Sequence, residues 1–167
     1  MTLSEQILRQ QFERRKADAL DLRSRAPELD GTATIAEERK APIFDPVKDY
    51  SNWPVGSPVR ELVGNEYQVF KLLQPHNASH YPTSTPSNTP SLWSICHTTE
   101  PIQAKPFLAP NGTSGMYMLG ECCTENGHIY RSLVDNGVYA PSAYASNWED
   151  LGTIDSWHTD PLAITDG

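Results

Sequence analysis

The chain has 167 residues, a formal net charge of −8 at pH 7 and a sequence pI of about 5.0. A surface of this charge repels phosphate backbones, so we expect no nucleic-acid partner. No apolar run approaches the roughly 20 residues of a membrane-spanning helix, and the N-terminus lacks the apolar stretch of a secretory signal. We therefore expect neither a membrane partner nor a signal peptide.

Residues 3 to about 24 are predicted to form a helix, because strong helix formers dominate this segment. Ser4 is the expected N-cap, and Pro27 is expected to end the helix. Its apolar residues form an interrupted stripe: Leu3, Ile7, Leu8, Phe12, Ala19 and Leu20. Such a helix is not stable alone in water, so we interpret residues 1–27 as an attachment or oligomerisation element.

A heptad with Leu3, Gln10 and Ala17 at one core position predicts a homo-oligomer, although the polar Gln10 weakens that seam. The basic residues of the helix are interpreted as a solvated face. These are Arg9, Arg14, Arg15 and Lys16.

Charged and small residues over 28–41 predict a linker, with a short helix from Thr34 to Lys40. From Pro42 onward, short alternating apolar and polar stretches lie between Pro, Gly, Asn and Ser clusters, which is typical of short strands joined by turns. We predict a first β module over 42–100, a second over 101–153, and a C-terminal tail over 154–167.

A repeat with a period of about 64 residues supports two β modules. In the first, Gly56 precedes Gly64 and Tyr67, and Trp93 follows; in the second, Gly120 precedes Gly127 and Tyr130, and Trp148 follows. Each set predicts a hairpin with a glycine-containing turn and a third strand that begins at the tryptophan. The predicted fold class is mainly β with an N-terminal α-helix and two small three-stranded units.

This pattern resembles the chitin-type carbohydrate-binding modules, and a helix before two such units is similar to small proteins encoded near the tail genes of phages and prophages. The resemblance covers residues 42 to 152. In the first unit its motif ends at Pro90-Ser91-Leu92-Trp93, and in the second it runs from Gly127 through Tyr130 to Trp148. Where this family carries a tryptophan before the loop proline, the chain has Tyr81 and Tyr139.

The candidate carbohydrate-binding residues are Tyr81 and Tyr139, whose rings lie near prolines in loops where they can be exposed and stack on a sugar, and Tyr144 as a third. In the alternative interpretation, the same rings cover a small core or contact a neighbouring subunit. Tyr67, Trp93, Tyr130 and Trp148 are predicted to be structural core. The sequence assigns neither Trp53 nor Trp157 to the core or to a binding surface.

No catalytic motif is present, so we expect no enzyme activity and no cofactor. Three cysteines, Cys96 and the adjacent Cys122 and Cys123, form neither a disulfide framework nor a metal motif, and we expect three free thiols and no metal site. The resemblance implies a strand around Cys122 and Cys123 that points one thiol inward and one outward.

The predicted function is that of a phage virion accessory or structural protein, in the tail, fibre or another external position, presenting carbohydrate-binding-like modules to host-surface glycan. Its expected location is the virion, after synthesis in the host cytoplasm, and its expected partners are other virion proteins and copies of itself. Two alternatives stay open: a connector or decoration protein that binds no sugar, and a binding module that serves a cell-wall hydrolase.

Overall fold

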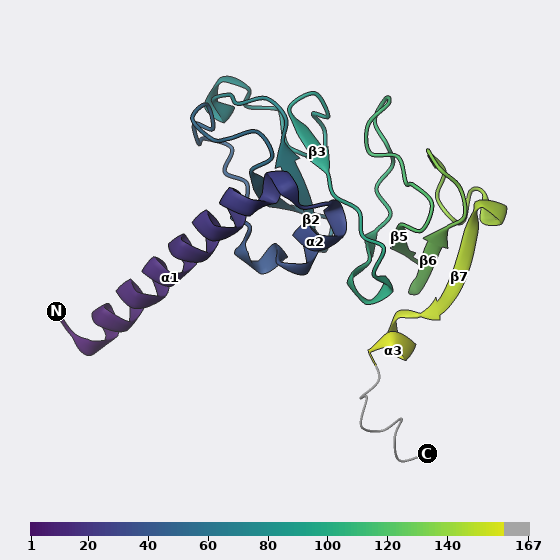
Figure 1. Ribbon diagram of the computed structural model, residues 1–167, viewed down its shortest axis with the longest axis horizontal. Helices are drawn as coiled ribbons and strands as arrows, with labels where there is room; N and C mark the ends of the chain where they lie inside the picture. The colour runs from purple at the N-terminus through teal and green to yellow at the C-terminus, as the bar shows by residue number, and fades with distance from the viewer. Residues whose placement is uncertain (159–167) are drawn as a thin grey trace, which may run out of the picture.

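A computed structural model describes residues 1–158 of the protein. A long N-terminal helix, α1 (Leu3–Arg25), extends away from two small β-sheets of three and four strands (Figure 1). This architecture confirms the predicted fold class of an N-terminal helix followed by two small β units. Within the described part of the chain, no helix is long and apolar enough to cross a membrane.

The first turn of α1 is fixed by Thr2 and not by Ser4, which corrects the predicted N-cap. The Thr2 hydroxyl accepts the Glu5 N–H at 3.1 Å, and the Glu5 carboxylate accepts the Thr2 N–H at 2.8 Å. This reciprocal capping box satisfies two backbone donors that the helix itself leaves unpaired. Ser4 lies inside the helix, one residue after its start.

The C-terminal end of α1 is attached to the first sheet. After Arg25 the chain makes one 3-10 turn, η1 (Ala26–Glu28), which contains Pro27. The Lys71 ammonium, from the first sheet, donates to the Ala26 carbonyl at 2.8 Å and to the Leu29 carbonyl. A cation is favourable at this end of a helix because the carbonyls there carry the negative end of the helix dipole.

Most of α1 makes little contact with the rest of the protein. Every residue from Met1 to Ala17 is exposed, including most of the predicted apolar stripe. Leu22, which that stripe did not include, is fully buried, and Ala26 beyond the helix is buried as well. The helix is therefore anchored by its last two turns.

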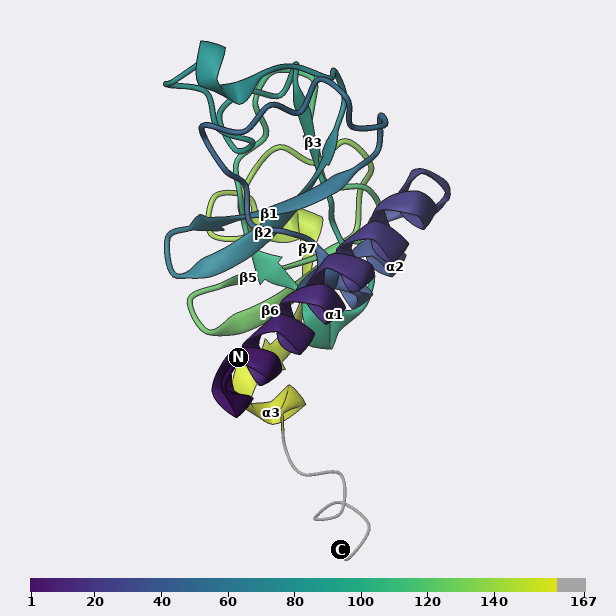
Figure 2. The same ribbon diagram turned by 90° about the vertical axis from the view of Figure 1, so that its left-hand side faces the viewer.

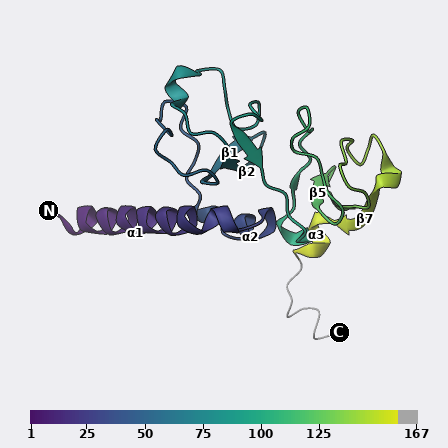
Figure 3. The same cartoon turned by 45° about the horizontal axis from the view of Figure 1, so that its top comes forward.

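The segment predicted as a linker, 28–41, is folded and contacts both β units. It forms α2 (Gly31–Ala36) and a 3-10 turn, η2 (Glu38–Lys40), so the predicted short helix begins earlier than expected. Thr34 and Ile35 are buried, and Ile35 belongs to a cluster that the first sheet completes. Figure 3 shows α1 and α2 following one another along one side of the β units.

The first sheet has three antiparallel strands in the order β1 (Pro58–Val63), β2 (Glu66–Leu72) and β3 (Trp93–Ile95). The two residues between Val63 and Glu66 make the hairpin turn, and Gly64 has a φ of 66° there. Glycine is suited to this left-handed conformation because it has no Cβ.

The second sheet has four strands where three were predicted. They are β4 (Lys105–Pro106), β5 (Cys122–Glu125), β6 (His128–Ser132) and β7 (Trp148–Thr153). The additional strand, β4, is only two residues long and pairs parallel to β5. At the β5–β6 turn Asn126 and Gly127 have φ values of 52° and 79°, and a type I′ turn requires positive φ at both of its central residues.

The chain continues after β7 into a short helix, α3 (Ile154–Trp157), where the sequence predicted only a tail. Residues 159–167 of that predicted tail lie outside the described residues. In Figure 2 the β1–β2 and β5–β6 hairpins lie one above the other, with their turns on the same side.

The first unit is built on three aromatic rings. Tyr50 stacks on Phe44 with 5.8 Å between centroids, and both rings meet Trp93 edge-on, at 5.3 Å and 5.8 Å. The buried Tyr50 hydroxyl accepts the Asp45 N–H at 2.8 Å, and burial raises the pKa of Tyr50 to about 12. Edge-to-face pairs of this kind are a favourable aromatic geometry.

The second unit repeats this arrangement with different residues. Tyr117 stacks on Phe107 at 5.2 Å, and both rings meet Trp148 edge-on, at 5.4 Å and 6.3 Å. The Tyr117 hydroxyl accepts the Leu108 N–H at 3.2 Å, and burial raises the pKa of this phenol too. The internal repeat is therefore a repeated aromatic core.

Strand register identifies the matching positions on β2 and β6. Trp93 pairs with Leu72, and Trp148 pairs with Ser132. Leu72 and Ser132 also make matching backbone hydrogen bonds. The N–H of each donates to the segment that precedes its hairpin, and the carbonyl of each accepts an N–H from the same segment. Leu72 and Ser132 are therefore equivalent, and positions along each strand can be counted from them.

By this count Tyr130 matches Phe70, and the predicted match of Tyr67 with Tyr130 is wrong. Phe70 and Tyr130 each lie two residues before the partner of the tryptophan, and each contacts the core of its unit. Tyr67 lies outside the buried clusters, half-buried, with the Arg60 guanidinium 4.9 Å from its ring centroid. The match failed because the first hairpin is longer than the second.

Side chains and backbone join the two units directly. The Gln68 side-chain amide donates to the Pro106 carbonyl at 2.8 Å, and the Cys122 N–H donates to the Thr98 carbonyl at 2.7 Å. The His97 ring stacks on Tyr117 with 3.8 Å between centroids. Burial lowers the pKa of His97, so this ring is neutral at pH 7.

Candidate carbohydrate-binding surface

Two predicted sugar-binding residues lie together on the second unit. Tyr139 and Tyr144 are 57% and 51% exposed, with 6.1 Å between their ring centroids and 25° between their planes. Rings that are nearly parallel at this distance are offset from one another. The pair therefore presents two adjacent aromatic surfaces to solvent.

The loop that carries these rings is held by hydrogen bonds to the core and to β5. The Trp148 indole donates to the Tyr139 carbonyl at 3.0 Å. The Ala140 carbonyl accepts the Tyr144 N–H at 3.0 Å, and the Glu125 carboxylate accepts another N–H of the loop at 2.8 Å. A buried tryptophan thus helps to position the exposed pair, which reduces the ordering needed when a ligand binds.

Tyr81 stands apart on the first unit. It follows the 3-10 turn η3 (Ala78–His80) and is 49% exposed. Its ring meets His76 edge-on at 5.9 Å, and His76 in turn meets Trp93 at 5.6 Å. Within residues 1–158, Tyr81 contacts no second exposed aromatic side chain, so this site offers a single ring.

The predicted equivalence of Tyr81 and Tyr139 is wrong. The His76 and Gly137 carbonyls are equivalent, because each accepts the N–H of the buried tyrosine in its own unit, at 2.7 Å and 2.9 Å. Tyr81 lies five residues after His76, whereas Tyr139 lies two residues after Gly137. The loops diverge from this point, and only the second places two rings together.

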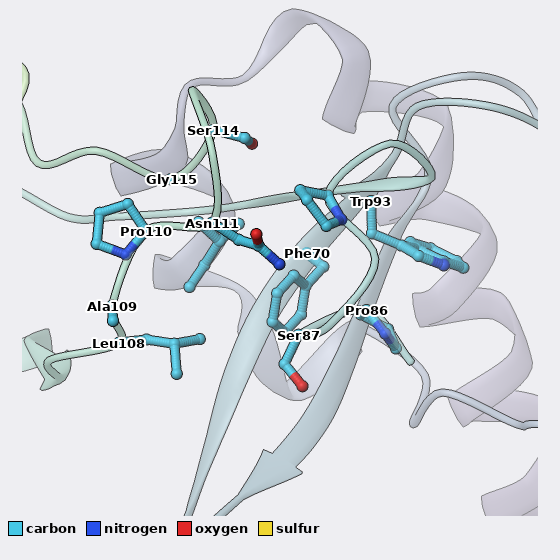
Figure 4. A pocket seen from close by; sticks show the side chains of 12 residues that line it. Phe70, Pro86, Ser87, Trp93, Leu108, Ala109, Pro110, Asn111, Ser114 and Gly115 are labelled. Atoms are coloured by element: carbon cyan, nitrogen blue, oxygen red, sulfur yellow. The ribbon is translucent and has the colours of Figure 1, made fainter. Parts of the chain in front are cut away.

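The small crevice between the two units has no room for a sugar. Figure 4 shows it between Phe70 and Trp93 on one side and Leu108 and Pro110 on the other. Its volume is about 30 Å³, whereas small-molecule sites usually enclose about 300 Å³ or more. The exposed aromatic pair is therefore a better candidate surface than this crevice.

The two tryptophans that the sequence left unplaced differ in their surroundings. Trp53 meets Tyr50 edge-on at 4.7 Å, and the Arg23 guanidinium lies 4.8 Å from its centroid. The Lys48 ammonium lies 5.6 Å from the same ring, so two cations contact it. Trp157 is 37% exposed and donates its indole N–H to the Leu151 carbonyl at 2.9 Å.

The three cysteines are free thiols, and all three are buried. Burial raises the pKa of Cys96 to about 12. The expectation that one of Cys122 and Cys123 points outward is wrong: Cys123 lies in the aromatic core, and the Cys122 thiol lies 3.8 Å from the Thr99 carbonyl. Both faces of β5 are covered here, so alternation along the strand exposes neither side chain.

Among residues 1–158, no group of three or more His, Cys, Asp or Glu side chains is arranged to hold a metal ion. The His128–Asp150 pair, 3.0 Å apart, lies at the exposed edge of the second sheet, and its hydrogen bond lowers the pKa of Asp150. This contact joins neighbouring strands β6 and β7.

A comparison of the sequence with models of known protein families finds no match, and a comparison with curated proteins finds none either. The resemblance to chitin-type modules therefore stays a prediction, and the candidate surface is argued from its geometry.

Proposed function

We propose that this protein is a non-enzymatic accessory component of a phage particle, in the tail, fibre or another external position, and that its second β unit binds host-surface glycan. The Tyr139–Tyr144 pair is the observation that carries the glycan-binding part. Its rings are exposed, adjacent and held by a loop that the core supports. The phage part rests on the sequence resemblance.

Aromatic rings bind sugars because the apolar C–H face of a pyranose packs on the ring, removing both surfaces from water. A shallow platform of two tyrosines gives a weak site, with a dissociation constant of about 1 mM and a binding free energy of about 4 kcal/mol. Many copies on one particle convert weak sites into firm attachment through avidity. Weak single contacts also let a particle sample several cells before it attaches.

The test is retention of full-length protein, coupled at high density to beads, on chitin, cell-wall glycan and capsular polysaccharide. Replacing both Tyr139 and Tyr144 with Ala is expected to abolish retention on the glycan that binds the wild type. Tyr81→Ala is the matched control, since it removes one exposed ring from the first unit, and it should keep most retention. Unchanged retention in the double variant would place the binding site elsewhere.

A connector that binds virion proteins and no sugar is the second candidate. The exposed apolar residues of α1, among them Leu8 and Phe12, favour it because they offer a protein-binding surface. Wild-type protein retained on none of the three glycans would support the connector. Loss of assembly into the particle in a Leu8→Ser, Phe12→Ser variant would support a role for α1 in attachment under either candidate.

A further inference from the structure

Charge is divided unevenly between α1 and the rest of the chain. The helix contains six Lys or Arg and four Asp or Glu residues, whereas the whole chain contains 13 Lys or Arg and 21 Asp or Glu residues. Seven basic and 17 acidic residues therefore lie outside the helix. A basic element on an acidic protein attracts negatively charged partners to one place on its surface.

A groove lies where the C-terminal half of α1 meets the first β unit. Its volume is about 420 Å³. Ala19 and Leu20 line it from the helix, and Ile43 and Trp53 line it from the β unit. Ile43 and Leu20 are 54% and 45% exposed, so this apolar surface is open to solvent.

The charged residues that line this groove are mostly basic. Lys16 and Arg23 line it from α1, and Lys48 lines it from the loop before Tyr50, against the single acidic residue Asp45. Arg23 and Lys48 both contact the Trp53 ring, at 4.8 Å and 5.6 Å from its centroid. The groove therefore combines an apolar floor with a basic rim.

An adjoining hollow extends the basic surface across α1. It shares Ala19, Pro42 and Ile43 with the groove and has a volume of about 290 Å³. Its charged lining residues are four basic ones and one acidic one: Arg15, Arg39, Lys40, Arg60 and Asp18. Toward the N-terminus, Leu8 and Phe12 precede Ala19 at helical spacing and share its face. They are 64% and 63% exposed, and Arg15 and Lys16 separate them from Ala19 on this face.

We infer that this groove binds an acidic amphipathic helix from another protein of the assembly. The apolar face of such a helix would pack on Trp53, Ile43 and Leu20, and its carboxylates would meet Lys16 and Lys48. A second copy of α1 fits less well, because its excess of basic residues would face the same basic rim. The inference deepens the proposed role of α1 in attachment to the particle, and it rests on that role.

The probe is a synthetic amphipathic peptide of about five helical turns, with leucines on one face and glutamates elsewhere. A matched peptide carries lysines in place of the glutamates. Titration into full-length protein is followed by calorimetry and by the NMR signal of the Trp53 indole N–H. The acidic peptide is expected to bind about tenfold or more tightly than the basic one and to weaken as salt is raised.

Charge reversal locates the site. Lys16→Glu with Lys48→Glu, both at exposed groove residues, should weaken binding of the acidic peptide by about tenfold or more. Arg9→Glu with Arg14→Glu is the control, because it makes the same charge change on the exposed part of α1, outside the groove, and should weaken binding less than about threefold. Equal effects of the two double variants would overturn the inference.

Three further outcomes would also overturn it. The first is no binding of the acidic peptide, and the second is equal binding of both peptides. The third is a wild-type dimer in sedimentation that the double change Lys16→Glu with Lys48→Glu dissociates, because the occupant of the groove would then be a second copy of this chain. Glycan retention on beads is measured on the same variants. Retention without peptide binding contradicts only this inference, whereas peptide binding without retention contradicts only the glycan-binding proposal.

Discussion

The two β units share a buried core and differ in what surrounds it. In the first, Trp93 is 2% exposed and belongs to a cluster of six buried residues. In the second, Trp148 is 7% exposed and its cluster has three. The stacked Phe–Tyr pair and the edge-on Trp are the same in both, so these three rings define the unit.

The surfaces of the two units have diverged. The β1–β2 hairpin has six residue pairs, whereas the β5–β6 hairpin has four. The first unit also buries one side against α2 and is attached to α1, while the second carries the exposed pair of Tyr139 and Tyr144. A duplicated core thus supports attachment in one unit and a candidate binding surface in the other.

Removal of the core tryptophans is expected to have the largest effect. Trp93→Ala and Trp148→Ala should each lower the free energy of unfolding by about 3–5 kcal/mol, because each leaves a cavity among packed rings. We expect Trp93→Ala to be the more damaging, since its cluster is larger and its ring less exposed. Urea unfolding of full-length variants, followed by circular dichroism, measures both.

Trp157→Ala is the control for this pair, because that ring is 37% exposed on α3. It should change the free energy of unfolding by less than about 1 kcal/mol. A loss for Trp148→Ala no greater than the control's would show that the second triad is not the core of its unit.

The buried tyrosine hydroxyls test whether the two cores are equivalent in detail. Tyr50→Phe removes the acceptor for the Asp45 N–H, and Tyr117→Phe removes the acceptor for the Leu108 N–H. Each change should lower the free energy of unfolding by about 1 kcal/mol, since the ring remains and only one hydrogen bond is lost. A loss in one variant alone would show that the two hydroxyls have different roles.

The elements that the sequence predicted well depend on local chemistry. Helix formers followed by Pro27 set the extent of α1, and Asn126 with Gly127 set a type I′ turn, because these residues act through their own backbone preferences. The burial of Trp93 and Trp148 agrees with the prediction, since large rings near apolar neighbours are usually buried.

The features that the sequence did not predict depend on distant partners. Phe44 and Tyr50 are six residues apart, whereas Phe107 and Tyr117 are ten apart, so no fixed spacing revealed the repeated stack. Ile35 was assigned to a linker because its partners lie on another element. Positional matching of the two hairpins failed for the same reason, because their unequal length appears only in the strand register.

The candidate surface shows the same limit. Exposure of Tyr81, Tyr139 and Tyr144 follows from their loops, but the loop fold decides which rings meet. The Trp148 indole holds the Tyr139 carbonyl, and a turn at Ala140 brings Tyr144 next to Tyr139. Neither contact has a recognisable sequence motif.

The smallest expected effect concerns the ion pairs that join α1 to the segment after it. Arg25 donates to Asp21 at 2.8 Å and to Glu37 at 2.6 Å, and Lys40 donates to both carboxylates. Hydrogen bonds from Arg25, and then from Lys40, lower the pKa of Asp21 and that of Glu37 to about 2. The ordinary values are 3.8 and 4.5.

Because both pKa values are lower in the folded state, these pairs stabilise the fold fully above about pH 5, and their contribution is lost as the pH falls toward 2. Solvent screens these exposed groups, so the effect is small. Urea midpoints at pH 6 and pH 2.5 should differ less in Glu37→Gln than in the wild type. Glu13→Gln, on the exposed part of α1, should keep the wild-type difference. If Glu37→Gln also keeps it, the ion pairs of Glu37 add nothing to stability, and α1 is held against the first unit by its other contacts, among them those of Leu22, Arg23 and Lys71.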